Sequence, residues 1–159
     1  SESHGLAKAA GIFQGERTIP VLLDYFEQLG SGDDFRRMCI LDSLIFNPDR
    51  HYGNFGVMFD TETMEPICMC PVFDNNRSLF PDLDQDQLEH PDWYLQRCKP
   101  MLGKDFLITA RALMTPEIRS DLKNMIGFQF SQHKRITAPQ ERLDALSEII
   151  NRQIKAILE

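Results

Sequence analysis

Apolar residues recur at helical spacing along most of the chain. The clearest case is residues 31–46, where side chains three or four positions apart share one face of a helix: Phe35, Met38, Leu41 and Ile45. A second stripe runs beside this face through Cys39, Asp42 and Phe46. Two such stripes predict a helix that is buried on most of its sides. Similar spacing predicts further helices over residues 18–30, 103–113, 115–128 and 137–159.

Residues suited to helix ends stand at the edges of these ranges. Thr18, Thr115 and Thr137 each precede a proline by one or two positions, which is typical of a helix N-terminus. Ser31 has an acidic residue three positions later, the spacing of a capping box, and Gly30 provides a stop signal for the helix before it. The helix boundaries predicted from periodicity and from capping therefore agree.

Residues 56–70 follow a different pattern. Two short apolar runs flank the turn-like segment DTETMEP, which predicts two strands that form a hairpin. Residues 1–17 are polar and show no period, so we expect a linker or tail there. The acidic stretch over residues 82–89 is expected to be a solvated loop before or within a short helix. The predicted fold is mainly α with a small β-hairpin, in a single domain over residues 18–159.

The composition narrows the class of protein. With 159 residues, 42% of them hydrophobic, the chain can form one globular domain with its own core. A net charge of −7 argues against nucleic acid as a direct partner, because phosphate binding needs a concentrated basic surface. No apolar run approaches the ~20 residues that span a bilayer, and the start of the chain lacks a signal-peptide pattern. We therefore expect a cytoplasmic protein with no membrane partner.

The four cysteines raise the possibilities of disulfides and of metal binding: Cys39, Cys68, Cys70 and Cys98. Cys68 and Cys70 form a Cys-x-Cys motif, but no second pair and no histidine lies at ligand spacing from it. A structural zinc site usually combines two such pairs. Reduced thiols of a cytosolic protein are the expected state.

Two clusters of polar residues stand at either end of the predicted hairpin. The first contains Asp49, Arg50, His51 and Asn54, and the second begins at Asp74. Because a hairpin returns the chain to its starting point, we expect Asp74 to approach Asn54. Their oxygen atoms are hard ligands of the kind that holds Mg²⁺ jointly with substrate phosphates. Asp49 lies five residues before Asn54, the separation between the catalytic aspartate and a magnesium-binding asparagine in protein kinases.

The same residues also admit purely structural roles. Asp49 and Asn54 could cap turns, and Asp74 could begin an Asx-turn. His51 could be a hydrogen-bonded core histidine. Two arginines could either pair with nearby carboxylates or contact phosphate: Arg50 and Arg77.

The two segments LIFNPDRHYGNFGVMFD and PVFDNNRSLF resemble the catalytic core of HipA-like serine/threonine kinases, many of which are toxins of bacterial toxin–antitoxin pairs. The Asp-Arg-His-x-x-Asn portion also resembles the catalytic loop of phosphatidylinositol 3-kinase-like enzymes. The resemblance implies that Asp49 is the catalytic base and that Asn54 and Asp74 hold Mg²⁺ with ATP. It implies that His51 orients the loop. The implied reaction transfers the ATP γ-phosphate to a hydroxyl of a protein substrate.

A complete kinase also has a Gly-rich loop over the phosphates and a strand lysine that contacts them. Neither has a recognisable counterpart in this sequence, so the resemblance implies a protein-kinase-like C-terminal lobe with its N-terminal lobe absent. The chain could be a fragment, half of a split kinase or a degenerate relative. We expect the isolated chain to be inactive or nearly so until an N-terminal lobe completes it. The alternative is a non-catalytic interaction domain that binds an antitoxin or another partner protein.

Overall fold

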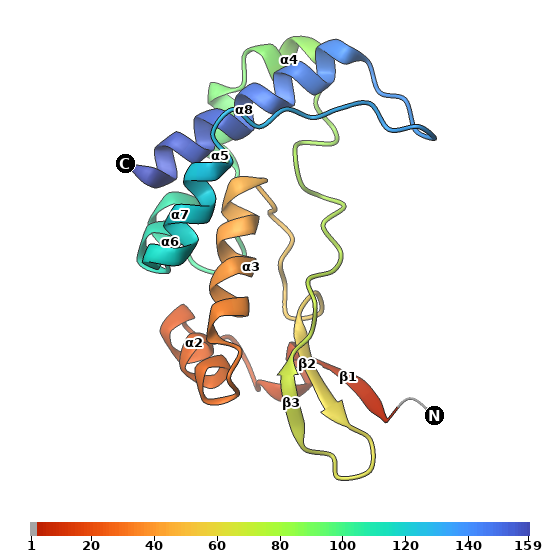
Figure 1. The fold of residues 1–159 in the computed structure, drawn as a ribbon, viewed down its shortest axis with the longest axis vertical. Coiled ribbons are helices and arrows are strands. Elements are labelled where there is room, and N and C mark those ends of the chain that lie inside the picture. Colours follow the sequence, from red (N-terminus) through yellow and green to blue (C-terminus); the bar gives the residue numbers. More distant parts are fainter. Residues whose placement is uncertain (1–2) are drawn as a thin grey trace.

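The computed structural model of the protein describes residues 3–159. Helices predominate, and three short strands form one small sheet (Figure 1). In chain order the elements are β1 (His4–Lys8), α1 (Ala9–Ile12), α2 (Ile19–Gln28), α3 (Gly32–Leu44), β2 (Gly56–Asp60), β3 (Pro66–Met69), α4 (Gln85–Glu89), α5 (Asp92–Arg97), α6 (Phe106–Ala112), α7 (Pro116–Asn124) and α8 (Gln140–Leu158). The sheet lies at one end of the molecule, and α4 and α8 lie together at the other (Figure 1).

The predicted hairpin is confirmed, but the sheet is larger than expected. β2 is the central strand and pairs antiparallel with both β1 and β3. The prediction of a linker or tail over residues 1–17 is wrong for residues 4–12, which form β1 and α1. Gly5 and Ala7 give β1 little intrinsic strand preference. The strand forms because its backbone pairs along the whole of β2, from His4 opposite Asp60 to Lys8 opposite Gly56.

α3 forms the centre of the helical part and contacts α2, α6 and α8 (Figure 1). Its prediction as a helix buried on most sides is confirmed, since Phe35 and Met38 are fully buried. Phe35 stacks on Phe26 of α2 with ring centroids 5.2 Å apart. A second apolar cluster between α4, α6 and α8 contains Phe46, Leu88, Phe106, Ala145, Leu146 and Ile149. The main apolar cluster includes Phe35, Met38 and Leu44 of α3, and the second contains Phe46, just after the helix. The loop that follows α3 therefore leaves a rigid support.

The helix-cap predictions are only partly correct. Thr115 accepts a hydrogen bond from the backbone N–H of Ile118 and caps α7 as expected. Ser31 makes no side-chain cap on α3. Its buried hydroxyl oxygen instead accepts the backbone N–H of Met69 at 2.9 Å and joins α3 to β3. The acidic stretch is a loop that leads into α4, where Asp84 forms a capping box.

Within residues 3–159, no helix combines the length and the apolar character that crossing a bilayer would require.

Candidate active site

The polar loop that follows α3 is fixed first by Asn47. This residue is fully buried, and its amide N–H donates to the Asp42 carboxylate at 2.9 Å. Its amide oxygen accepts the backbone N–H of Asp49 at 3.1 Å. One side chain therefore joins the last turns of α3 to the start of the loop and sets the path of the chain from the helix to Asp49.

Arg50 occupies the centre of the loop and is 1% exposed. Its Nε and Nη2 atoms donate to the two carboxylate oxygens of Asp42, each at 2.9 Å. Burial raises the pKa of the Asp42 carboxyl above its usual value, and the hydrogen bonds from Arg50 and Asn47 oppose that rise. The two possibilities for Arg50 are thereby resolved. Its guanidinium pairs with a carboxylate inside the protein and does not face solvent, where a phosphate would bind.

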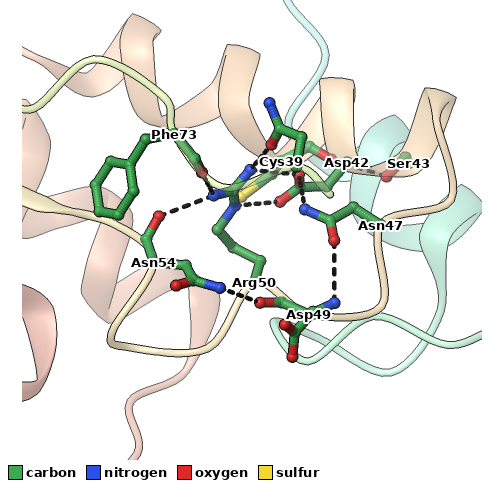
Figure 2. Close-up of polar contacts among 9 residues, drawn as sticks. Cys39, Asp42, Ser43, Asn47, Asp49, Arg50, Asn54 and Phe73 are labelled. Atoms are coloured by element: carbon green, nitrogen blue, oxygen red, sulfur yellow. Dashed lines mark hydrogen bonds and ion pairs between the residues drawn. The ribbon is translucent and has the colours of Figure 1, made fainter. Parts of the chain in front are cut away.

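The remaining guanidinium donors of Arg50 bind the chain on both sides of the hairpin (Figure 2). Nη1 donates to the carbonyl oxygens of Asn54, at 2.8 Å, and of Phe73, at 2.6 Å. Nη2 also donates to the side-chain oxygen of Asn75. A guanidinium has five N–H groups, so every donor of Arg50 has a partner. We call this set of bonds the Arg50 clamp. It holds the backbone of Asn54 beside the residue that precedes Asp74.

The side chains predicted to act on substrate keep their oxygen atoms free. Asn54 is 5% exposed and donates its amide N–H to the Asp49 carbonyl oxygen at 2.8 Å. Its amide oxygen accepts no hydrogen bond from any residue between 3 and 159. The carboxylates of Asp49, which is half-buried, and Asp74, which is exposed, have no ion-pair or hydrogen-bond partner in the same range. These oxygens are available to a ligand.

Asp74 has a backbone conformation that side chains rarely adopt, with φ of 55°. Aspartate tolerates the left-handed region better than most residues, but the conformation is still strained by about 1 kcal/mol or more. Two flanking bonds keep it there, because the Arg50 clamp holds Phe73 on one side and Asn75 on the other. The backbone that carries the Asp74 carboxylate is thus held by its neighbours.

His51 lies at the surface, so its interpretation as a core histidine is wrong. Its Nδ1 accepts the backbone N–H of Gly53 at 2.9 Å and shapes the turn locally. A Cβ at residue 53 would lie 2.7 Å from the His51 ring, so a larger residue there would displace the ring. The loop as a whole is oriented by Arg50 and Asn47. Arg77, the other undecided arginine, is exposed and lies 3.6 Å from the Asp82 carboxylate.

Sequence reasoning missed the role of Asp42. The sequence places this residue only in a helical stripe. A carboxylate on the apolar stripes near the end of this helix was the available signal, because a buried charge needs a partner. That partner is Arg50, eight residues later.

No family model matches the sequence, and no curated protein matches it. Among solved structures, the fold is similar to the crystal structure of the proinflammatory kinase CtkA from Helicobacter pylori. The two structures align with a TM-score of 0.63 and 16% sequence identity over 99% of this chain and 71% of that chain. At this identity the likeness shows the fold alone. This mostly helical chain with its small antiparallel sheet has a kinase-like fold.

Proposed function

We propose that the chain carries the phosphoryl-transfer site of a HipA-like serine/threonine kinase and corresponds to its C-terminal lobe. The Arg50 clamp is the observation that carries this proposal. It holds Asn54 and the segment of Asp74 together, and it leaves their side-chain oxygens without partners among residues 3–159. A turn that only reversed the chain would have no need for this arrangement.

The residues fit a magnesium ion. Asn54 uses its amide nitrogen on the Asp49 carbonyl, so the amide oxygen is the atom left for a metal. Asp74 contributes an exposed carboxylate. Mg²⁺ prefers oxygen ligands and is commonly bound through one or two protein groups together with substrate phosphates. When bound, the ion neutralises charge on the phosphates of ATP.

Asp49 is the proposed proton acceptor. The substrate hydroxyl oxygen forms a bond to the γ-phosphorus, the bond from that phosphorus to the β–γ bridging oxygen breaks, and the hydroxyl proton passes to the Asp49 carboxylate. ADP leaves with the electrons of the broken bond. Asp49 suits this role because its backbone is fixed on both faces, through its N–H to Asn47 and through its carbonyl from Asn54. Its carboxylate is consequently positioned by bonds that do not involve the carboxylate itself.

An N-terminal lobe, supplied by the same or another polypeptide, would provide the remaining contacts to adenine and phosphate. The isolated chain should therefore bind Mg·ATP weakly and turn over slowly. We expect phosphoryl transfer at an ordinary kinase rate only in the completed assembly.

Calorimetric titration with Mg·ATP tests the proposal. We expect weak binding by the wild type and a loss of binding by Asp74→Ala. Asp82→Ala is the matched control, since it removes the same charge from a nearby exposed position and should leave binding unchanged. Equal binding by wild type and Asp74→Ala would remove Asp74 as a ligand. An absence of Mg·ATP binding by the completed assembly would leave the non-catalytic interaction domain as the better account.

A further inference from the structure

A pocket of about 500 Å³ opens beside the loop that carries Asp49. Its walls come from residues 10–17, residues 50–52 and residues 101–104. The backbone that directly follows Asp49 is one of these walls. A molecule in this pocket, which we call the loop pocket, would therefore contact the residues that directly follow Asp49 in the chain.

Tyr52 joins the first wall of the loop pocket to the second. Its carbonyl oxygen accepts the backbone N–H of Ala10 at 2.9 Å. Its hydroxyl oxygen accepts the backbone N–H of Arg17 at 2.5 Å and lies 3.3 Å from the Arg17 carbonyl. Its ring also packs near that of Phe13, with centroids 6.2 Å apart. The position of Arg17 is therefore set by the loop itself.

The charges that face the loop pocket differ from those of the molecule as a whole. The chain carries a net charge of −7, yet this pocket is lined by Arg17 and Lys104 against one carboxylate, Glu16. Both cations are exposed, and neither forms an ion pair within residues 3–159. Two unpaired cations that face one cavity on an acidic protein can attract an anionic ligand into it.

His51 adds a hydrogen-bond donor to the same pocket. Its Nδ1 accepts the Gly53 N–H, so the neutral ring carries its proton on Nε2. The pocket also has an apolar part, to which Phe13, Met101 and Leu102 contribute. Such a cavity can accommodate the stem of a side chain as well as its charged end.

We propose that the loop pocket binds an anionic side chain of the protein substrate, a carboxylate or a phosphate, close to the hydroxyl that is phosphorylated. The inference rests on the proposed function for the nature of the substrate. It assigns Arg17 and Lys104 to recognition of the anion and the Nε2–H of His51 to a hydrogen bond with it. The preferred substrate is then an acidic or already phosphorylated segment around a serine or threonine.

Titration of three serine peptides into the full chain tests the inference by NMR, without nucleotide. The peptides are identical except that the positions flanking the serine carry glutamate, phosphoserine or glutamine. We expect the glutamate and phosphoserine peptides to shift the backbone signals of Tyr52, Gly103 and Lys104, and the glutamine peptide to leave them unchanged. These signals report on the pocket whether or not phosphoryl transfer occurs.

Charge reversal provides the specific control. Arg17→Glu combined with Lys104→Glu should weaken binding of the anionic peptides at least about tenfold, since two attractions become repulsions. Lys134→Glu combined with Arg135→Glu changes the net charge equally in the exposed loop before α8 and should change binding less than about twofold. Both variants alter exposed side chains, and far-UV circular dichroism verifies that each is folded.

Each outcome of these titrations has a definite meaning. Binding of the phosphoserine peptide alone supports the site and makes phosphate its ligand, whereas binding of both anionic peptides supports a general anion site. Equal binding of the glutamine peptide overturns the inference, as does absence of all binding or an equal loss in both variants. The proposed function is tested separately, by the titration with Mg·ATP. If the chain binds Mg·ATP but no anionic peptide, the proposed function stands and the inference about the loop pocket is overturned. If the chain binds anionic peptides but the completed assembly does not bind Mg·ATP, the loop pocket is an anion site in a protein without kinase activity.

Discussion

Replacement of Arg50 by methionine tests the clamp that organises the loop. Methionine keeps much of the side-chain volume but has no N–H donor. The variant leaves the Asp42 carboxylate, 4% exposed, without its cation. It also leaves the carbonyl oxygens of Asn54 and Phe73 without the donor they share. Removal of one member of a buried ion pair costs about 3–5 kcal/mol. That is a large part of the ~5–15 kcal/mol by which a domain is usually stable.

Thermal unfolding followed by far-UV circular dichroism measures this loss. For a chain of this size, we expect the melting temperature to fall by about 6–20 °C, at ~2–4 °C for each kcal/mol. The double variant Asp42→Leu/Arg50→Met removes both charges, and it should be more stable than Arg50→Met by about 2 kcal/mol. A cost below about 1 kcal/mol for Arg50→Met would refute the reasoning. So would a double variant whose loss of stability equals the sum of the losses caused by Asp42→Leu alone and by Arg50→Met alone.

Three further changes test separate parts of the molecule. If the proposed function is correct, Asp49→Asn should lower phosphoryl transfer by the completed assembly about 10²–10⁴-fold while Mg·ATP affinity is kept. A parallel loss of affinity in calorimetry would contradict the proposed role of Asp49 as proton acceptor. Ser31→Ala should destabilise the fold by about 1–3 kcal/mol in urea unfolding, because the buried Met69 N–H loses its acceptor, and an unchanged midpoint would show that this bond is dispensable. Burial raises the pKa of the Cys98 thiol to about 11, so its thiolate fraction at pH 8 is about a hundredfold below that of an ordinary thiol. Mass spectrometry should then detect alkylation at Cys98 that is slow at pH 8 and faster as the pH rises toward 11. Equally fast labelling at pH 8 and pH 11 would contradict this prediction.

The helical part of the fold could be predicted because its signals are local. The apolar spacing of α3 and the threonine–proline start of α7 each depend on a few consecutive residues. The two strands of the hairpin were predictable for the same reason. β1 was not, since its short sequence shows little preference by itself and its stability comes from β2, about fifty residues later. Ser31 shows the same limit, because its role depends on Met69 and not on the helix it precedes.

The residues of the candidate site were proposed from the sequence, but the bonds that hold its loop could not be predicted there. The spacing of Asp49 and Asn54 and the hairpin that follows are visible in the sequence. The long-range bonds of Arg50 to Phe73 and Asn75 are not, since they join segments separated by the whole hairpin. The solvent exposure of individual side chains could not be predicted from the sequence either. His51 proved to be exposed, while the neighbouring arginine is almost completely buried.

The Arg50 clamp has an evolutionary consequence. The residues that hold the loop, Asp42 and Arg50, are distinct from those proposed to act on substrate, Asp49 and Asp74, whose carboxylates stabilise nothing within residues 3–159. Mutations that abolish chemistry therefore cost little stability, whereas mutations of the clamp threaten folding. A lineage that abandoned catalysis would be free to lose Asp49 and Asp74 and constrained to keep the buried pair. Among homologous sequences, we therefore expect Asp42 and Arg50 to be retained wherever the fold is kept, and Asp49 and Asp74 only where the proposed activity is kept.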